Sequence, residues 1–140
     1  MKNLNPAQKT ALEDAARQAC RYAYAPYSNF PVGAAVLTDS GQIVTGCNVE
    51  NASLGLSCCA ERVALFNAVS QGQQRIVALA IYTPTATPTP PCGACRQVLQ
   101  EFAAEAVIIS LCQSDQRLES SLTSLLPMAF SVNRRQDQKT

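Results

Sequence analysis

The spacing of apolar residues along the chain changes between a helical period and runs typical of strands. From about residue 6 to residue 22, small apolar side chains recur three and four positions apart, and Asn5 followed by Pro6 is a typical helix start. Similar apolar faces occur twice more. The pattern predicts helices over about residues 6–22, 59–70 and 93–104.

Short apolar runs rich in β-branched residues predict five strands. The runs at 32–38 and 43–50 flank the turn sequence DSGQ, so we expect a hairpin. The run at 76–83 is almost entirely apolar, as in strands covered on both faces. A further strand follows at 106–112, and a weaker one at about 117–121. Helices and strands in this order predict an α/β fold, a three-layer α-β-α sandwich around a five-stranded mixed sheet.

The length of 140 residues suits one domain. We expect this domain to span residues 1–132 and a polar C-terminal tail to occupy 133–140. The segment TPTATPTPP at 83–91 is rich in threonine and proline, but it is short and both flanks resemble core. We therefore interpret it as a stiff connection within the domain.

Charge and hydropathy narrow the choice of partners. Only 15% of the residues are charged, against roughly 25% in an average domain, which favours burial of surface in a homo-oligomer. A net charge of +1 offers little attraction for nucleic acid or anionic membranes. The N-terminus has no apolar leader, and no apolar run approaches the roughly 20 residues of a membrane span. We expect a cytoplasmic protein without nucleic-acid or membrane partners.

Seven cysteines and no histidine restrict the chemistry. Thiols stay reduced in the cytoplasm, so metal ligands and core thiols are favoured over disulfides. Without histidine, a serine-histidine or cysteine-histidine nucleophile is excluded within one chain. A general acid or base must be a carboxylate, a lysine, a tyrosine or a thiol.

Cys92 and Cys95 form a C-x-x-C motif at the start of a predicted helix. Taken alone, this motif is compatible with half of a zinc site, with a redox dithiol, or with two unligated thiols. A dithiol oxidoreductase is therefore an alternative function.

Cys59 favours a metal, because it stands at the start of another predicted helix. Helix N-termini stabilise thiolates, so the three cysteines can serve as ligands together. Three protein ligands leave a position for water, as in catalytic zinc sites. Glu61 lies two residues beyond Cys59, where its carboxylate can approach the open side of the metal as general acid and base. Cys58 is adjacent to Cys59, so its side chain leaves the backbone in another direction, and the cysteines at 20, 47 and 112 are more simply core thiols.

These motifs resemble a known family. C-A-E followed by P-C-G-A-C-R-Q resembles the zinc-dependent cytidine deaminases, in the version with three cysteine ligands. The segments YAPYSNFPVGAAVLT, GCNVENAS and LLPMAF are also similar to that family, so the resemblance covers about residues 10–131. It implies hydrolytic deamination of free cytidine and 2'-deoxycytidine to the uridine products in pyrimidine salvage, by small homotetrameric enzymes. A related antibiotic deaminase would use the same zinc site.

The resemblance also assigns roles to single residues. It implies one zinc ion per subunit and Glu61 as the group that carries a proton from water to ring N3 and then to the leaving amino group. It further implies that the zinc ligands are Cys59, Cys92 and Cys95. The residues that would contact the nucleoside are Phe30, Asn48, Glu50 and Ala60. Phe130 would be an aromatic residue supplied by a neighbouring subunit.

Arg62 has a physical rationale of its own. Three thiolates on Zn²⁺ leave a net negative charge, and a guanidinium that donates to the sulfurs would withdraw part of it. Two positions depart from the family pattern: Leu54 stands where an aromatic residue is common, and Met128 where glycine is common. Both departures leave the zinc chemistry intact and concern substrate preference.

Overall fold

The computed structural model describes residues 3–132. Four helices and five strands alternate along these residues, with two short 3-10 turns. The helices are α1 (Pro6–Ala19), α2 (Ala60–Ser70), α3 (Gly93–Phe102) and α4 (Leu122–Leu125), and the turns are η1 (Cys20–Tyr22) and η2 (Leu54–Leu56). The strands are β1 (Gly33–Thr38), β2 (Ile43–Cys47), β3 (Ile76–Tyr82), β4 (Val107–Leu111) and β5 (Arg117–Ser121).

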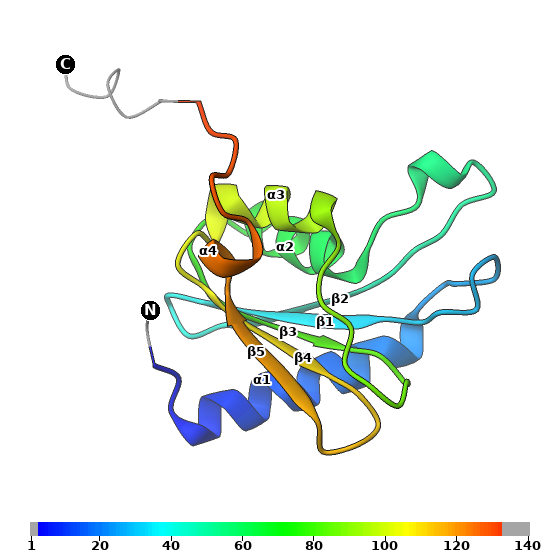
Figure 1. Cartoon of the computed structure of the whole chain (residues 1–140), viewed down its shortest axis with the longest axis horizontal. Coiled ribbons are helices and arrows are strands. Elements are labelled where there is room, and N and C mark those ends of the chain that lie inside the picture. Colours follow the sequence, from blue (N-terminus) through cyan, green and yellow to red (C-terminus); the bar gives the residue numbers. More distant parts are fainter. Residues whose placement is uncertain (1–2, 133–140) are drawn as a thin grey trace.

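The strands form one mixed sheet in the order β2-β1-β3-β4-β5. The pair β3–β4 is parallel and the other three pairs are antiparallel. Helix α1 covers one face of the sheet, and α2 and α3 cover the other, with α4 beside α3 (Figure 1). The predicted three-layer α-β-α sandwich is therefore confirmed.

The sheet divides the core into two layers, because neighbouring residues of a strand point to opposite faces. In β1, Ala34 and Val36 belong to the layer under α2 and α3, whereas Ala35 and Leu37 belong to the layer against α1. All six residues of β1 are buried. This explains why the strand is a continuous apolar run rather than an alternating pattern.

The second strand ends at Cys47, so the prediction of a strand to residue 50 was too long. The side chain of Asn48 accounts for the difference. Its Oδ1 accepts a hydrogen bond from Val32 N at 2.8 Å, and its Nδ2 donates to Phe30 O at 2.8 Å. The chain then leaves the sheet, and Val49 forms isolated bridges with Tyr24 and Cys58.

Gly46 lets α2 lie directly on β2. A Cβ at this position would lie 2.3 Å from the backbone N of Ala64 and 2.8 Å from the carbonyl oxygen of Ala60. Atoms cannot approach so closely, so only glycine allows this contact. The contact sets the height of the start of α2 above the sheet.

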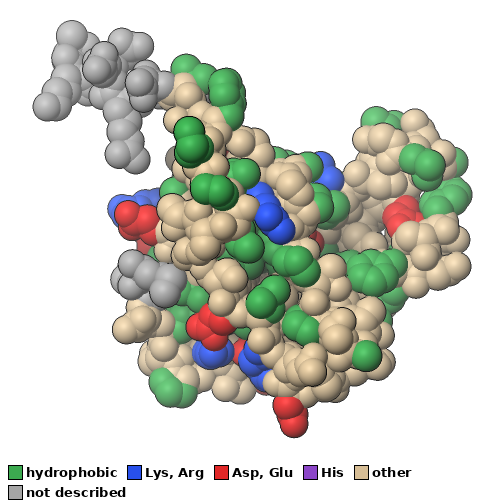
Figure 2. All heavy atoms as spheres, viewed as in Figure 1, with side chains coloured by type: hydrophobic (Ala, Val, Ile, Leu, Met, Phe, Trp, Pro, Cys, Tyr) green, Lys and Arg blue, Asp and Glu red, His purple; other side chains and the backbone are tan. Residues whose placement is uncertain are grey.

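The two segments that follow α1 and β2 extend beyond the sheet on one side of the molecule (Figure 1). Apolar side chains remain on the surface there, among them Leu54 and Leu56, which are 70% and 71% exposed. Figure 2 shows this projecting part separated from the body by a hollow. Within residues 3–132, none of the helices is long and apolar enough to cross a membrane.

Candidate functional site

Two helix starts bring three cysteines together. Cys59 is the N-cap of α2, Cys92 is the N-cap of α3, and Cys95 lies in the first turn of α3. The Sγ atoms of Cys59 and Cys92 are 3.9 Å apart, and all three Sγ atoms lie within 4.8 Å of one another. The expected partnership of Cys59 with the C-x-x-C motif is thus present in the structure.

The three sulfurs fit a zinc ion. Zinc–sulfur bonds of about 2.3 Å in tetrahedral geometry place the sulfurs about 3.8 Å apart, close to the separation of Cys59 and Cys92. Thiolates are ligands that zinc favours, and three of them leave a fourth position open. No other cluster of potential metal ligands occurs in the described part of the chain. The site can therefore hold zinc with room for one further ligand.

The remaining four cysteines are free thiols outside this cluster. Cys20 and Cys112 are buried, and Cys47 and Cys58 are half-buried. The buried positions of Cys20 and Cys112 agree with the prediction that they are core thiols, whereas Cys47, predicted with them, is only half-buried. Burial raises the pKa of Cys20, Cys47 and Cys58, as expected for thiols without a metal.

Hydrogen bonds stabilise the thiolate form of Cys59. A hydrogen bond from Cys95, with further hydrogen bonds and charge from Arg62, lowers the pKa of Cys59 to about 5. The same hydrogen bond to Cys59, together with burial, raises the pKa of Cys95. Nη2 of Arg62 lies 3.3 Å from Cys59 Sγ, and this contact raises the pKa of Arg62. Arg62 is thus placed to withdraw charge from the sulfur, as its chemistry predicts.

Glu61 lies in the first turn of α2 and is only 5% exposed. Burial raises the pKa of its carboxyl group, and the negative charge of Cys59 acts in the same direction. A buried carboxyl group with a raised pKa beside the cysteine cluster is suited both to take up and to release protons.

A cavity of about 390 Å³ opens beside the cysteine cluster. This volume falls within the roughly 300–1,000 Å³ of small-molecule sites. The cavity is lined by two residues of the cysteine cluster and by other polar and apolar side chains. The lining residues are Ser28, Phe30, Val32, Asn48, Glu50, Cys59, Ala60, Glu61, Ile81, Thr83, Thr89, Pro90 and Cys92.

Two polar residues hold the loop that forms one wall of the cavity. The Glu50 carboxylate accepts hydrogen bonds from Tyr27 N at 2.9 Å and Ser28 N at 3.0 Å, and also from the Ser28 hydroxyl. The bonds from Ser28 lower the pKa of Glu50. A carboxylate can accept about four hydrogen bonds, so Glu50 retains capacity for one more. The amide of Asn48, with two N–H donors, likewise uses only one of them in the bond to Phe30.

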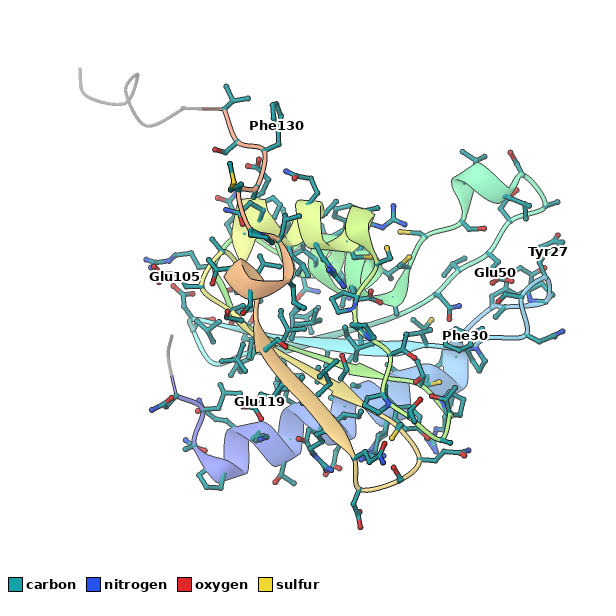
Figure 3. All side chains as sticks on the ribbon, in the orientation of Figure 1. Tyr27, Phe30, Glu50, Glu105, Glu119 and Phe130 are labelled. Atoms are coloured by element: carbon teal, nitrogen blue, oxygen red, sulfur yellow. The ribbon has the colours of Figure 1, made fainter. Side chains whose placement is uncertain are left out.

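The predicted nucleoside contacts gather in the cavity, with one exception. Phe30, Asn48, Glu50 and Ala60 all line it. Phe130 is 74% exposed and lies on the C-terminal segment, far from Phe30 and Glu50 (Figure 3). Near it, Met128 has a φ of 54°, in the left-handed region that favours glycine, the residue that the family resemblance led us to expect at this position.

Several residues that line the cavity were not predicted from the sequence. Thr83, Thr89 and Pro90 belong to the segment interpreted as a mere connection, yet they line the cavity. The Thr83 hydroxyl contacts that of Thr85 at 2.7 Å and that of Thr89 at 3.4 Å. Their position immediately before the C-x-x-C motif was the available signal, since a segment that leads into Cys92 must pass beside the cysteine cluster.

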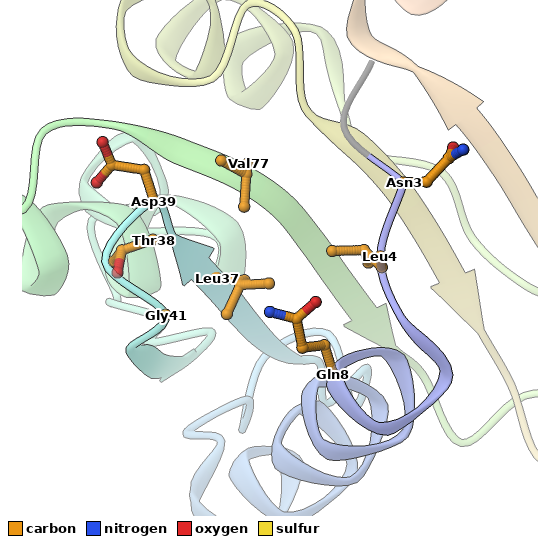
Figure 4. A pocket seen from close by; sticks show the side chains of 8 residues that line it. All are labelled: Asn3, Leu4, Gln8, Leu37, Thr38, Asp39, Gly41 and Val77. Atoms are coloured by element: carbon orange, nitrogen blue, oxygen red, sulfur yellow. The ribbon is translucent and has the colours of Figure 1, made fainter.

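A second hollow, of about 100 Å³, lies between the start of α1 and the β1–β2 turn (Figure 4). Asp39 is its only ionisable lining residue, among Leu4, Leu37, Val77 and other neutral side chains. Asp39 instead faces Arg75, with Oδ2 3.6 Å from Nε. This hollow has no group of residues suited to catalysis.

Comparison with known proteins gives a consistent result. The sequence model of the family described as "Cytidine and deoxycytidylate deaminase zinc-binding region" matches residues 6–111. A cytidine deaminase from Halalkalibacterium halodurans is 49% identical over 117 residues, which are 82% of this chain and 88% of that protein. One from Mycobacterium tuberculosis is 45% identical over 118 residues, 84% of this chain and 86% of that protein.

Solved structures agree with these sequence relatives. The crystal structure of cytidine deaminase from Burkholderia pseudomallei superposes with a TM-score of 0.83 at 46% identity, covering 86% of this chain and 98% of that chain. The structure of the Mycobacterium tuberculosis protein has a TM-score of 0.76 at 43% identity, covering 89% and 98%. The chain is therefore similar to these proteins in sequence and in fold over most of its length.

Proposed function

Because this chain belongs to the cytidine and deoxycytidylate deaminase family, we propose that it hydrolyses free cytidine and 2'-deoxycytidine to uridine and 2'-deoxyuridine with release of ammonia. One observation carries this proposal: three convergent cysteine sulfurs and the buried carboxyl group of Glu61 lie beside a cavity of nucleoside size. Removal of the amino group would place the reaction in pyrimidine salvage.

Cys59, Cys92 and Cys95 would hold one zinc ion per chain. When bound, zinc lowers the pKa of water from 15.7 toward about 7 and so supplies a nucleophile at neutral pH. Glu61 would accept a proton from the attacking water and deliver it to ring N3. It would then take the proton of the hydroxyl group formed at C4 and pass it to the amino group, which leaves as ammonia while the C4 carbonyl forms. Its raised pKa suits both directions of transfer. Arg62 would withdraw charge from the Cys59 sulfur through the 3.3 Å contact.

Four lining residues outside the cysteine cluster would bind the nucleoside. Asn48 retains one N–H and Glu50 one acceptor position, so the pair is suited to a sugar hydroxyl. Phe30 offers an aromatic face for the pyrimidine, and the buried Ala60 would contact the base beside Glu61. The cavity volume of about 390 Å³ is in the range for a small molecule, which supports a free nucleoside rather than a polynucleotide as substrate.

The assembly would be a homotetramer in which Phe130 completes the site of a neighbouring subunit. Its large exposure and its distance from the cavity of its own chain support this arrangement (Figure 3). Free thiols throughout residues 3–132 suit a reducing, cytoplasmic environment. The catalytic domain would comprise residues 1–132; the proposed tail at 133–140 lies outside the described residues.

Replacement of Glu61 tests the proposal. Glu61→Gln should keep one zinc per chain and the fold but reduce kcat for cytidine by at least about 10²–10⁴-fold, the usual loss when general acid–base catalysis is removed. Zinc content is measured on the same sample as ammonia release. Glu105→Gln, at an exposed position, is the matched control. Wild-type protein that is inactive on both nucleosides, or an active Glu61→Gln variant, would contradict the proposal.

A further inference from the structure

Arg96 connects two segments that lie on either side of α3. Its Nε donates to the carbonyl oxygen of Pro91 at 2.8 Å, and its Nη1 donates to the carbonyl oxygen of Leu125 at 2.9 Å. Pro91 immediately precedes the metal ligand Cys92, and Leu125 is the last residue of α4. One guanidinium group therefore contacts both the loop that carries a metal ligand and the start of the C-terminal segment.

The Pro91 carbonyl oxygen has few possible hydrogen-bond donors other than Arg96. Pro91 is buried, and it lies outside the hydrogen-bond pattern of α3. Prolines at 90 and 91 have no N–H with which to fix this part of the backbone. Within residues 3–132, Arg96 is the only donor to this carbonyl. By holding the Pro91–Cys92 peptide, Arg96 constrains the direction in which the Cys92 side chain leaves the backbone.

The Leu125 carbonyl is one of the unpaired carbonyls at the C-terminus of α4, where a positive charge is favourable. The next residue of α3 continues the connection, since Gln97 Nε2 donates to the carbonyl oxygen of Phe130 at 3.0 Å. Two neighbouring side chains of α3 thus form hydrogen bonds with two carbonyl oxygens of the C-terminal part of the chain. The bond from Gln97 reaches the residue that we expect in a neighbouring site.

We propose that Arg96 is a positioning residue that fixes Cys92 through the Pro91 carbonyl and, with the same guanidinium group, sets the C-terminal segment relative to the metal site. The planar guanidinium group has five N–H donors in a rigid arrangement, so it can hold two carbonyls in a defined relation. A lysine at this position would offer a single mobile ammonium group. The positioning of Cys92 by Arg96 does not depend on which substrate is deaminated. Only the role of Phe130 in a neighbouring site rests on the proposed function.

Zinc affinity is the direct measurement, by competition with a chromophoric chelator at constant pH. Arg96→Met retains the length of the side chain but removes both hydrogen bonds. We expect its zinc affinity to fall by about 10–100-fold, the usual effect of losing a group that orients a metal ligand. Arg96→Lys should lie between Arg96→Met and the wild type. It also provides the test if Arg96→Met does not fold, and a wild-type zinc affinity in Arg96→Lys would overturn the proposal.

Two control variants separate positioning from general stability. Arg117→Met also removes an arginine with two contacts to another element, but on the far side of the sheet from the cysteines. It should leave zinc affinity within about twofold while lowering Tm. Gln97→Ala releases only the Phe130 carbonyl and should also leave zinc affinity within about twofold. A loss in either control as large as that in Arg96→Met would overturn the proposal, as would unchanged zinc affinity in Arg96→Met.

Kinetics provide a second readout that is independent of zinc affinity. With zinc in saturating excess, Gln97→Ala should raise KM for cytidine more than it lowers kcat, because it loosens only the C-terminal segment. Arg96→Met should also lower kcat, because Cys92 remains misplaced. If neither variant nor the wild type deaminates cytidine, the proposed function fails, whereas the zinc measurements still decide the role of Arg96.

Discussion

At the cysteine cluster, single hydrogen bonds decide which sulfur carries charge before a metal arrives. Cys59 accepts hydrogen bonds from Cys95 and Arg62 and has a pKa of about 5, whereas the pKa of Cys95 is raised. At neutral pH the metal-free site therefore holds a thiolate at Cys59 and a proton on Cys95. Zinc binds thiolates, so it must displace that proton.

This arrangement predicts a pH-dependent zinc affinity. Between about pH 6 and pH 8 the affinity should rise with pH by at least about tenfold per unit, because the Cys95 proton leaves on binding. Cys59 adds to this dependence only when the pH falls toward about 5, where it becomes protonated. Chelator competition in a series of buffers measures the slope. An affinity that stays constant from pH 6 to pH 8 would show that Cys95 is already deprotonated.

Contacts between elements determine where the helix starts lie. Helix α2 rests on β2 at Gly46, where a Cβ would lie 2.3 Å from Ala64 N. The neighbours are backbone atoms, which cannot rotate away as a side chain could. Any side chain at residue 46 must therefore lift α2, and with it Cys59 and Glu61.

Gly46→Ala should consequently lower both stability and zinc affinity. We expect a loss of about 1–3 kcal/mol in the free energy of unfolding, typical of overpacking, and a reduced zinc affinity because Cys59 moves. Gly55→Ala is the control, since a Cβ there meets nothing within 4 Å and its φ is not positive. Urea unfolding and chelator competition measure the two effects. Equal effects of both substitutions would exclude the contact with α2 as the cause.

Two ion pairs join α1 to β5 on the other face of the sheet. Arg117 contacts Glu13 through Nη2–Oε2 at 2.8 Å and Nε–Oε1 at 3.1 Å, and the Glu13 side chain is only 10% exposed. Lys9 contacts Glu119 at 2.8 Å, but these side chains are 34% and 50% exposed. The two pairs join the same elements and differ mainly in burial and geometry.

The difference in burial predicts unequal contributions to stability. Arg117→Met leaves the buried Glu13 carboxylate without its partner and should cost about 1–3 kcal/mol. Lys9→Met removes an exposed pair and should cost about 0–1 kcal/mol. Urea unfolding of both variants measures the comparison. If Lys9→Met were the more destabilising substitution, burial would not be the deciding factor.

For the molecule as a whole, the important fact is that one chain does not bring all the predicted site residues together. Phe30, Asn48, Glu50 and Glu61 line one cavity, whereas Phe130 lies elsewhere on the surface (Figure 3). Low charge and exposed apolar side chains at the projecting loops favour association of several copies. In such an assembly each site would combine residues from two chains.

Mixed assemblies test this arrangement. Glu61→Gln and Phe130→Ala subunits should each have low kcat/KM alone. When they are co-expressed and purified together, some sites combine an intact Glu61 with Phe130 from the other subunit type, so kcat/KM should exceed that of either parent. Assays on the parents mixed immediately before measurement are the control. If Phe130 acts within its own chain, co-expression restores no such site and activity stays at the level of the parents.

Local patterns were sufficient to predict the five strands and the three longer helices, and to single out Cys59, Cys92, Cys95 and Glu61 as candidate site residues. Helix periodicity, caps and the C-x-x-C spacing depend on residues close together in the chain, and an absence of histidine leaves few other metal ligands. The prediction of β2 beyond Cys47 was wrong because it ignored the Asn48 side chain, which forms hydrogen bonds with the backbone of Val32 and Phe30 just before β1. Such bonds to the backbone compete with strand pairing.

Other features depended on contacts between distant residues. Cys59 and Cys92 are 33 positions apart, and only the packing of α2 and α3 on the same face of the sheet places their sulfurs 3.9 Å apart. Three further features have no periodic pattern in the sequence. They are the threonines that line the cavity, the contact of α2 with Gly46, and the hydrogen bonds from Arg96 to two carbonyl oxygens. They arise from distances between elements, because hydrogen bonds and close packing depend on spatial position rather than on separation along the chain.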